Sequence, residues 1–353
     1  KEEVKIMNSN FETIKNELSK IFSEYTVDKP SSVIEKGFKG MYIDVFVLRE
    51  VRGPIIFRNT ERTELTYTML NGRLHVEVYS RKFKAPEKIT GLKILKEYGA
   101  LPDGYLYNAL DSNDKLKNPV SVLYGDSVTL GSQGAQIPSR ILYTWALSPQ
   151  EYNCVSEERT HNALSEIGTM WEVKEGEKGF KETLFKNIYM KRGHLLQLVS
   201  FYNVSLNELI FGLGNILHTN SYGAEDSVNV RSLSNHIIAI ALSKPFEIPV
   251  TPYTIINSIP GENMECENLL KNEEVENLMK SKIKEQIKGL GYARLLEDNE
   301  LKNVIMKVNE IYSKRDLLEE LVENLKKDAE EFVDKMILRK AQKGSRRGGD
   351  NGG

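Results

Sequence analysis

The chain has 353 residues, of which 40% are hydrophobic and 28% are charged, and its net charge at pH 7 is −2. This composition is that of a soluble globular protein, and the length allows one large domain or two ordinary ones. No run of about 18 apolar residues exists, so the sequence predicts no transmembrane helix. Acidic residues exceed basic ones in residues 262–340, whereas residues 1–261 are neutral overall. Any basic surface that attracts an anionic ligand must therefore be local.

The cysteine content is low. The two cysteines, Cys154 and Cys266, have no second Cys or His at the spacing of metal ligands, so we expect no zinc site. Two isolated cysteines also fit a reducing compartment. The N-terminal residues lack the long apolar core of a signal peptide, and we expect a cytoplasmic protein.

The N-terminal half mixes one helix with strands. Apolar residues recur every three or four positions over 3–25, which predicts a helix with one apolar stripe. Residues 41–50 predict a buried strand, and the alternation over 72–83 predicts a half-exposed one. Residues 85–138 contain few long apolar runs and are interpreted as an insertion of loops and short strands. Residues 139–148 predict another strand.

The middle of the chain predicts an arm and a capped helix. Residues 149–182 are polar and turn-rich, which indicates a projecting arm or hairpin. Residues 182–204 predict one or two strands. The helix expected over 205–217 begins with Ser205 and has Glu208 three positions later, which is the pattern of a capping box.

The C-terminal part is predicted to be helical. A strand over 236–248 comes first, and helical periodicity follows from about residue 265, with Ser313 as the expected cap of the last helix. Residues 341–353 are predicted to be a disordered tail. The order of elements favours the α+β class, a sheet with helices on one face as in a ferredoxin-like core, rather than a doubly wound repeat.

One loop resembles a phosphate site. Residues 126–140 carry Gly131 and Gly134 and end in Ser139 and Arg140. The Lys of a P-loop is missing, and a strand rather than a helix follows. Backbone N–H groups and Arg140 could still hold a phosphodiester backbone. A flexible β-connection is the alternative.

A second polar loop covers residues 218–237. It combines amides, hydroxyls, the Tyr222 ring and the Arg231 guanidinium. This mixture is typical of sites that hold single-stranded nucleic acid. The alternative is an ordinary surface loop.

Two shorter stretches are basic. Arg58 and Arg62 flank Glu61, and they could either contact phosphate or form a surface ion pair of little energetic value. In residues 80–84 cations surround an aromatic ring, which is a modest nucleic-acid signal. Those cations are Arg81, Lys82 and Lys84.

Evidence for catalysis is thin. The five histidines are scattered, and no Ser-His-Asp order carries a local signature. Glu61 and Glu64 lie in an Arg-containing loop that a metal-assisted nuclease could use. Solvated surface carboxylates are the alternative.

Several segments together resemble a known family. Residues 37–82 read GFKGMYIDVFVLREVRGPIIFRNTERTELTYTMLNGRLHVEVYSRK. The segments that follow in the same order are SRILYTWALS, RTHNALSEIGT, ETLFKNIYMKRG and NILHTNSYGAEDSVNVRSLSNHI. They resemble the backbone subunit of type I-D CRISPR effector (Cascade) complexes, a member of the RAMP superfamily.

The resemblance implies a division into domains. An RRM-like palm would comprise residues 35–84, 139–148 and 183–260. The fingers would be residues 85–138, and the thumb would be residues 149–182. The remaining parts would be an N-terminal helix, a helical C-terminal region and a tail, at 1–34, 261–340 and 341–353.

The resemblance also implies a function. Such a subunit binds CRISPR RNA, lines up with other copies of itself along the guide, joins other Cascade subunits, and presents the guide to a target DNA strand in antiviral defence. It needs no cofactor and no membrane. The RNA-binding residues would be Arg58, Arg62, Arg81, Lys82, Lys84, Gly131, Gly134, Ser139, Arg140, Arg159, His161, Tyr222 and Arg231. Met170 and Trp171 would insert between bases of the guide, with the core of the hairpin as the alternative. We expect Arg58, Arg140 and Arg231 to lie along one open channel.

Two alternatives stay open. The same subunit could be a nuclease that cuts the bound target strand with a divalent metal through Glu61 and Glu64. The chain could instead bind a small phosphorylated ligand at residues 126–140.

Overall fold

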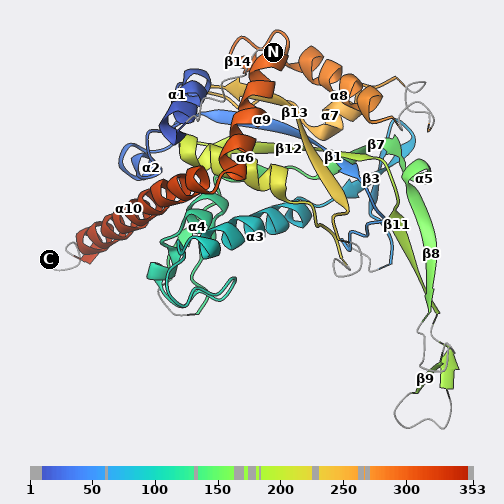
Figure 1. Ribbon diagram of the computed structural model, residues 1–353, viewed down its shortest axis with the longest axis horizontal. Helices are drawn as coiled ribbons and strands as arrows, with labels where there is room; N and C mark the ends of the chain where they lie inside the picture. The colour runs from blue at the N-terminus through green and yellow to red at the C-terminus, as the bar shows by residue number, and fades with distance from the viewer. Residues whose placement is uncertain are drawn as a thin grey trace, which may run out of the picture.

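A central antiparallel sheet organises the fold (Figure 1). The computed structural model describes residues 10–59, 63–130, 134–162, 171–173, 180–182, 184–224, 230–260, 266 and 271–348. Within them the sheet has eight strands in the order β14-β13-β1-β12-β7-β3-β2, and β6 also pairs with β12. The strands are β1 Tyr42–Val51, β2 Tyr67–Leu70, β3 Arg73–Val78, β6 Ile141–Tyr143, β7 Ala146–Glu151, β12 His194–Tyr202, β13 Leu233–Ser243 and β14 Ala293–Leu295.

Helices cover both faces of this sheet. Side chains alternate between faces along a strand. Val45 and Val47 of β1 therefore pack into one core, whereas Phe46 and Leu48 pack into another. The first core contains α1 Phe11–Phe22, α3 Arg81–Glu97, α6 Leu206–His218, α9 Asp298–Ser313 and the first part of α10 Arg315–Gly348. The second contains α7 Pro252–Asn257 and α8 Asn272–Ile287. The α+β class is confirmed, but the expectation of helices on one face is wrong.

Local signals located several elements correctly. The helix expected over 205–217 is α6, and both bonds of its capping box between Ser205 and Glu208 are present. Within the predicted N-terminal helix, α1 begins after Asn10, whose side chain accepts a hydrogen bond from the Thr13 N–H. The predicted strand over 72–83 ends earlier, because β3 stops at Val78 and α3 begins at Arg81.

The segment 85–138 differs from its prediction. It contains most of α3, the 3-10 helix Asn113–Leu116, α4 Pro119–Tyr124 and the short strands β4 Asp126–Ser127 and β5 Gln136–Ile137. Gly91 lies inside α3, where a Cβ would be 2.8 Å from Asn215 Nδ2 of α6. The glycine therefore serves close helix packing and does not end the helix.

The C-terminal region is helical, as predicted, with two differences. Ser313 is the last residue of α9 and does not cap the following helix. Helix α10 continues to Gly348, so the prediction of disorder is wrong for residues 341–348. The second half of α10 packs through Phe332, Val333 and Met336 against the segment that contains α4 and β5.

A two-stranded arm projects from the body (Figure 1). Strands β8 Ser156–Asn162 and β11 Leu184–Met190 pair antiparallel, and β9 Trp171–Val173 pairs with β10 Phe180–Glu182. An arm is thus present within the predicted segment 149–182, but it begins only at Ser156, because residues 149–151 belong to β7 of the central sheet. Its second strand extends to Met190. None of the described helices is both long and apolar enough to cross a membrane.

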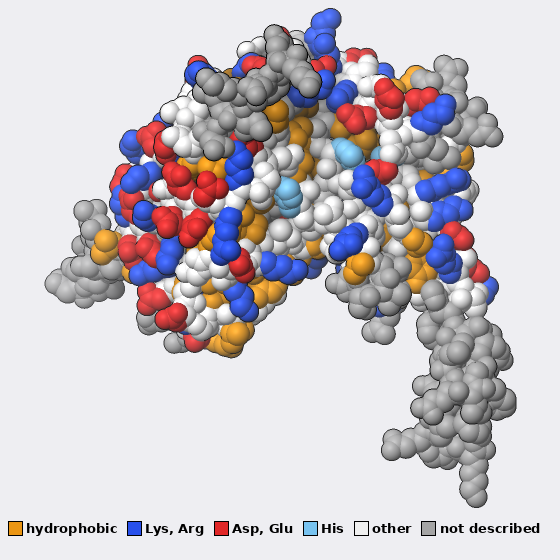
Figure 2. Space-filling model, viewed as in Figure 1, with side chains coloured by type: hydrophobic (Ala, Val, Ile, Leu, Met, Phe, Trp, Pro, Cys, Tyr) orange, Lys and Arg blue, Asp and Glu red, His pale blue; other side chains and the backbone are white. Residues whose placement is uncertain are grey.

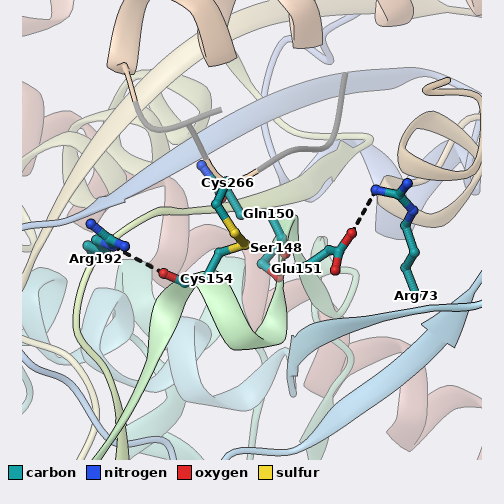
Figure 3. The surroundings of a disulfide bond; sticks show 7 residues. All are labelled: Arg73, Ser148, Gln150, Glu151, Cys154, Arg192 and Cys266. Carbon is teal, nitrogen blue, oxygen red and sulfur yellow. Dashed lines mark hydrogen bonds and ion pairs between the residues drawn. A yellow bond between two sulfur atoms is a disulfide. The ribbon is translucent and has the colours of Figure 1, made fainter. Parts of the chain in front are cut away.

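A disulfide lies at the root of the arm (Figure 3). Cys154 in the short helix α5 Tyr152–Val155 is bonded to Cys266, 112 positions away, with their Cα atoms 5.5 Å apart. The interpretation of two isolated cysteines is therefore wrong. The Arg192 Nε donates a 3.1 Å hydrogen bond to the carbonyl of Cys154 and links the β11–β12 turn to the same point.

Candidate nucleic-acid interface

A buried polar network lies in the middle of the sheet. Arg49 of β1 is fully buried, and its Nη1 donates to Glu87 Oε1 and to Asn235 Oδ1, each at 2.8 Å. The Tyr222 hydroxyl donates to Glu87 Oε1 at 2.9 Å. Burial and the charge of Glu87 raise the pKa of Tyr222 well above its usual value, so the hydroxyl keeps its proton.

This network changes the role assigned to Tyr222. The Tyr222 side chain is 1% exposed, so it cannot stack on a base in this structure, and its predicted contact with RNA is wrong. Tyr222 and Asn235 instead satisfy the buried charge of Arg49. A buried guanidinium needs such partners because unpaired it would lose several kcal/mol of solvation.

Arg140 is also a structural residue. Its side chain is 2% exposed, and its Nη1 donates to Glu208 Oε2 at 2.9 Å and to the Asn203 carbonyl at 3.0 Å. The prediction that Arg140 contacts RNA does not agree with this burial. The expected channel through Arg58, Arg140 and Arg231 is therefore absent from this structure.

The glycine-bearing loop is packed against its neighbours. A Cβ on Gly134 would lie 2.5 Å from the Val128 Cβ. The Ser139 hydroxyl accepts a 2.7 Å hydrogen bond from Lys84 Nζ. Burial, and then the charge of Lys88, lower the pKa of Lys84 to about 8. Gly131 lies outside the described residues.

A different set of cations meets at the root of the arm. We call it the arm-base surface, and it consists of Arg52, Arg58, Lys191, Arg192 and Arg231. Three loops carry these residues, and main-chain bonds hold the loops together. The N–H of residue 52 donates to the carbonyl of residue 232 at 2.8 Å, and residues 55 and 190 exchange bonds of 2.9 and 2.8 Å. Residue 56 bridges to residue 224.

The cations of this surface face solvent. Arg52, Arg58, Arg192 and Arg231 are exposed, and Lys191 is half-buried. Arg52 retains a 56% exposed side chain while its Nε donates to Glu50 Oε2 at 3.2 Å. Figure 2 shows Lys and Arg side chains grouped over the base of the arm, whereas basic and acidic side chains intermix over α1, α2 (Ser31–Lys36) and α10. The arm-base surface therefore offers a local positive potential on a chain of net charge −2.

The turn between β11 and β12 supplies two of these cations. Lys191 and Arg192 precede Gly193, which has a φ of 98° and so favours glycine. A Cβ there would also lie 2.6 Å from Val155 Cγ1. Sequence reasoning missed both cations, although the letters MKRG between two strands contain the signal of a basic turn.

The stretch 80–84 forms the start of a helix. Arg81 is exposed and Lys82 is half-buried, but Phe83 is fully buried against Phe57 and beneath the Arg49 guanidinium. Cations surround Phe83 in the sequence because Phe83 occupies a buried position in the first turn of α3. The Phe83 ring is therefore not accessible to a base.

The remaining predicted residues lie on the arm or in the loop before β2. Arg159 of β8 is exposed and lies 3.5 Å from Glu157. The backbones of His161 and Trp171 lie in β8 and β9, and nothing is described of their side chains. Met170, Glu61 and Arg62 lie outside the described residues. Glu64 is exposed, and it belongs to no group of three or more described acids, histidines or cysteines that could hold a metal ion.

A solved structure with a similar fold supports this architecture. The crystal structure of Csc2 from Thermofilum pendens is similar, with a TM-score of 0.59 and 14% identity over 90% of this chain and 94% of that one. Two chains of CRISPR RNA-guided surveillance complexes, one of them in a pre-nicking state, also match. The first has a TM-score of 0.48 and 9% identity over 77% of this chain and 98% of its own. The pre-nicking one has a TM-score of 0.45 and 8% identity over 73% of this chain and 93% of its own.

Sequence comparison gives the family. Curated protein sequences give no match. A family model described as Csc2 Crispr matches residues 31–322, which include the sheet, the arm and most of the helices. The chain therefore belongs to the Csc2 CRISPR family.

Proposed function

We infer that this chain is a CRISPR RNA-binding backbone subunit that acts in CRISPR defence, and that it holds the guide at the arm-base surface. Family membership supports the function, and the convergence of five cations from three loops supports the site. Arg and Lys side chains bind phosphates without reading sequence. A subunit that holds a guide needs this property, because base pairing between guide and target reads the sequence.

We also propose the assembly in which this contact works. Several copies line the guide of a type I-D Cascade complex in the cytoplasm, beside other Cascade subunits, and present the guide to a target DNA strand. The projecting β8–β11 arm supports this arrangement, because it carries Arg159 and Lys186 beyond the body of the subunit (Figure 1). No described feature favours metal-dependent cleavage at Glu64 or a small phosphorylated ligand at residues 126–140.

Charge reversal at the arm base tests the proposal. The variant combines Arg58→Glu, Arg192→Glu and Arg231→Glu, and it is expressed together with a guide RNA. We expect the purified protein to lose the guide, because three phosphate contacts become repulsive. The ratio of absorbance at 260 and 280 nm and the size of the particle measure the loss.

A matched control reverses three exposed cations elsewhere. The control variant combines Lys284→Glu on α8, Lys288→Glu at the residue after α8 and Lys302→Glu on α9. It changes the net charge by the same amount as the arm-base variant. This control should keep the guide. A folded arm-base variant that retains guide RNA like wild type, or a control that loses it equally, would contradict the proposal.

A further inference from the structure

An exposed aromatic ring stands on the loop before β1. Phe38, in the sequence KGFKG at residues 36–40, is 53% exposed although it is a large hydrophobic residue. One side of its ring stacks on Tyr202, with the centroids 5.4 Å apart and the planes 3° from parallel. Tyr202 stacks in turn on Tyr42 with a centroid distance of 4.8 Å. The stack therefore begins in the sheet and ends in a ring that reaches solvent.

The loop that carries Phe38 is fixed in place. The Lys39 N–H donates a 2.8 Å hydrogen bond to Oδ1 of Asn203, and the Asn203 N–H donates to the Met41 carbonyl at 3.1 Å. Asn203 is itself 1% exposed. At Gly40 a Cβ would overlap the carbonyl of Pro245, so the loop runs directly against that residue. The ring is thus held before any ligand arrives, which reduces the entropy that binding would cost.

Two cations flank Phe38 in the sequence. Lys36 and Lys39 are exposed, and within the described part of the chain neither ammonium group has an ion pair or a hydrogen bond. Both line a polar cavity of about 210 Å³ together with Thr26 and Ser32. Of the two carboxylates in its lining, Glu24 is paired with Lys244 at 2.7 Å, and only Asp28 opposes the lysines.

We propose that the loop of residues 36–40 is a second nucleic-acid contact, at which an unpaired base stacks on Phe38 and the adjoining phosphates contact Lys36 and Lys39. Aromatic rings beside cations bind single strands in this way, and stacking tolerates any base. A ring that served only the core would be covered, as Phe83 is. Two lysines within two positions of Phe38 in the sequence, neither of them paired with a described residue, favour a polyanion over an apolar protein partner.

This contact is separate from the arm-base surface. Phe38 precedes the first residue of β1, and Arg52 follows its last residue. Ten residues of strand span about 30 Å at the usual rise per residue. A guide held at the arm base would therefore leave the Phe38 loop available to another single strand, either DNA or RNA.

The experiment measures the binding of labelled 20-nucleotide strands that are not complementary to the guide. Guide-loaded particles are titrated in fluorescence anisotropy with a DNA strand and an RNA strand in separate arms, at two salt concentrations. Phe38→Ala should weaken binding about tenfold or more, and Phe38→Trp should preserve it. Lys36→Glu with Lys39→Glu should weaken binding and reduce its salt dependence. Asp28→Asn should tighten it.

Controls separate this proposal from the proposed function. Phe246→Ala removes another exposed ring, 64% exposed, and should leave strand binding unchanged. Each Phe38 variant should keep its guide, as the absorbance ratio will show. If wild type itself fails to retain guide, the proposed function fails. The same titrations on the guide-free arm-base variant then still test the Phe38 loop.

Two results would overturn the inference. In the first, Phe38→Ala binds both strands as tightly as wild type. In the second, Phe38→Ala weakens strand binding only in proportion to a loss of subunits from the particle, which would identify the ring as a contact between proteins.

Discussion

Burial decides what each arginine of this chain can do. Arg140 and Arg231 were both predicted to contact RNA, yet Arg140 is 2% exposed beside Glu208, whereas Arg231 is exposed at a turn with a φ of 57°. The same side chain is a structural ion pair in one place and an accessible cation in the other.

Removal of the buried Arg140 charge should destabilise the fold. Arg140→Ala leaves the Glu208 carboxylate buried without its partner, and we expect a loss of about 3–5 kcal/mol in the free energy of unfolding. Arg140→Met combined with Glu208→Gln should recover most of it, because no buried charge remains and the amide oxygen can still accept the hydrogen bond from the Ser205 N–H. Urea denaturation measures both. An Arg140→Ala protein of unchanged stability would contradict the assignment.

Asp44 of β1 gives stability an unusual dependence on pH. Burial, and then the charge of Glu247, raise its pKa to about 6, against the effect of the hydrogen bond from Ser200. Between pH 4 and 6 the Asp44 carboxyl therefore binds more protons in the folded state than in the unfolded state. The contribution of Asp44 to the free energy of unfolding falls as pH rises through this range.

Asp44→Asn should remove this dependence. The amide can still accept the hydrogen bond from Ser200 and carries no charge. We expect the variant to be about 3 kcal/mol more stable than wild type above pH 6, and the difference to shrink toward pH 4. Unfolding curves over this pH range measure it. A difference that stays constant with pH would show that Asp44 is not the titrating group.

At the scale of elements, the disulfide fixes the root of the arm. Cys154 belongs to α5, which leads into β8, and its bond to Cys266 closes a separation of 112 residues. Such a crosslink stabilises mainly by restricting the unfolded chain, by about 4–5 kcal/mol for a loop of this length. The arm that carries Arg159 therefore starts from a covalently fixed point.

Reduction should lower the melting temperature of the full chain. Thermal unfolding with and without a phosphine reductant measures the effect, and peptide mapping without reduction should find residues 154 and 266 linked. The variant Cys154→Ser with Cys266→Ser should melt at the lower temperature under both conditions. Wild-type protein with no linked peptide and no response to the reductant would show that the bond does not form.

At the scale of the molecule, net charge says little about function. The chain carries −2 overall, but α1, α2 and α10 mix acids with bases while the arm-base surface gathers cations. Counterions screen charges more than about 8–10 Å apart at physiological salt, so a bound polyanion responds to the local group. The two surfaces proposed to bind nucleic acid lie before and after the same strand, β1, which holds them apart at a fixed distance.

Short-range patterns in the sequence determined much of the architecture. The apolar run of β1, the capping box of α6 and the helical stripe of the C-terminal region all depend on residues a few positions apart, and each element formed. The α+β class followed from these patterns. The resemblance to a CRISPR family rested on the letters of the quoted segments, and it agrees with the family match.

Only the tertiary structure decided which polar residues reach a ligand. The burial of Arg140 and Tyr222 depends on Glu208 and Glu87, which lie far from them in the chain. The exposure of Phe38 depends on Asn203 and Pro245, which hold its loop. A local pattern specifies a side chain and its secondary structure, whereas its access to solvent is set by partners that only folding brings together.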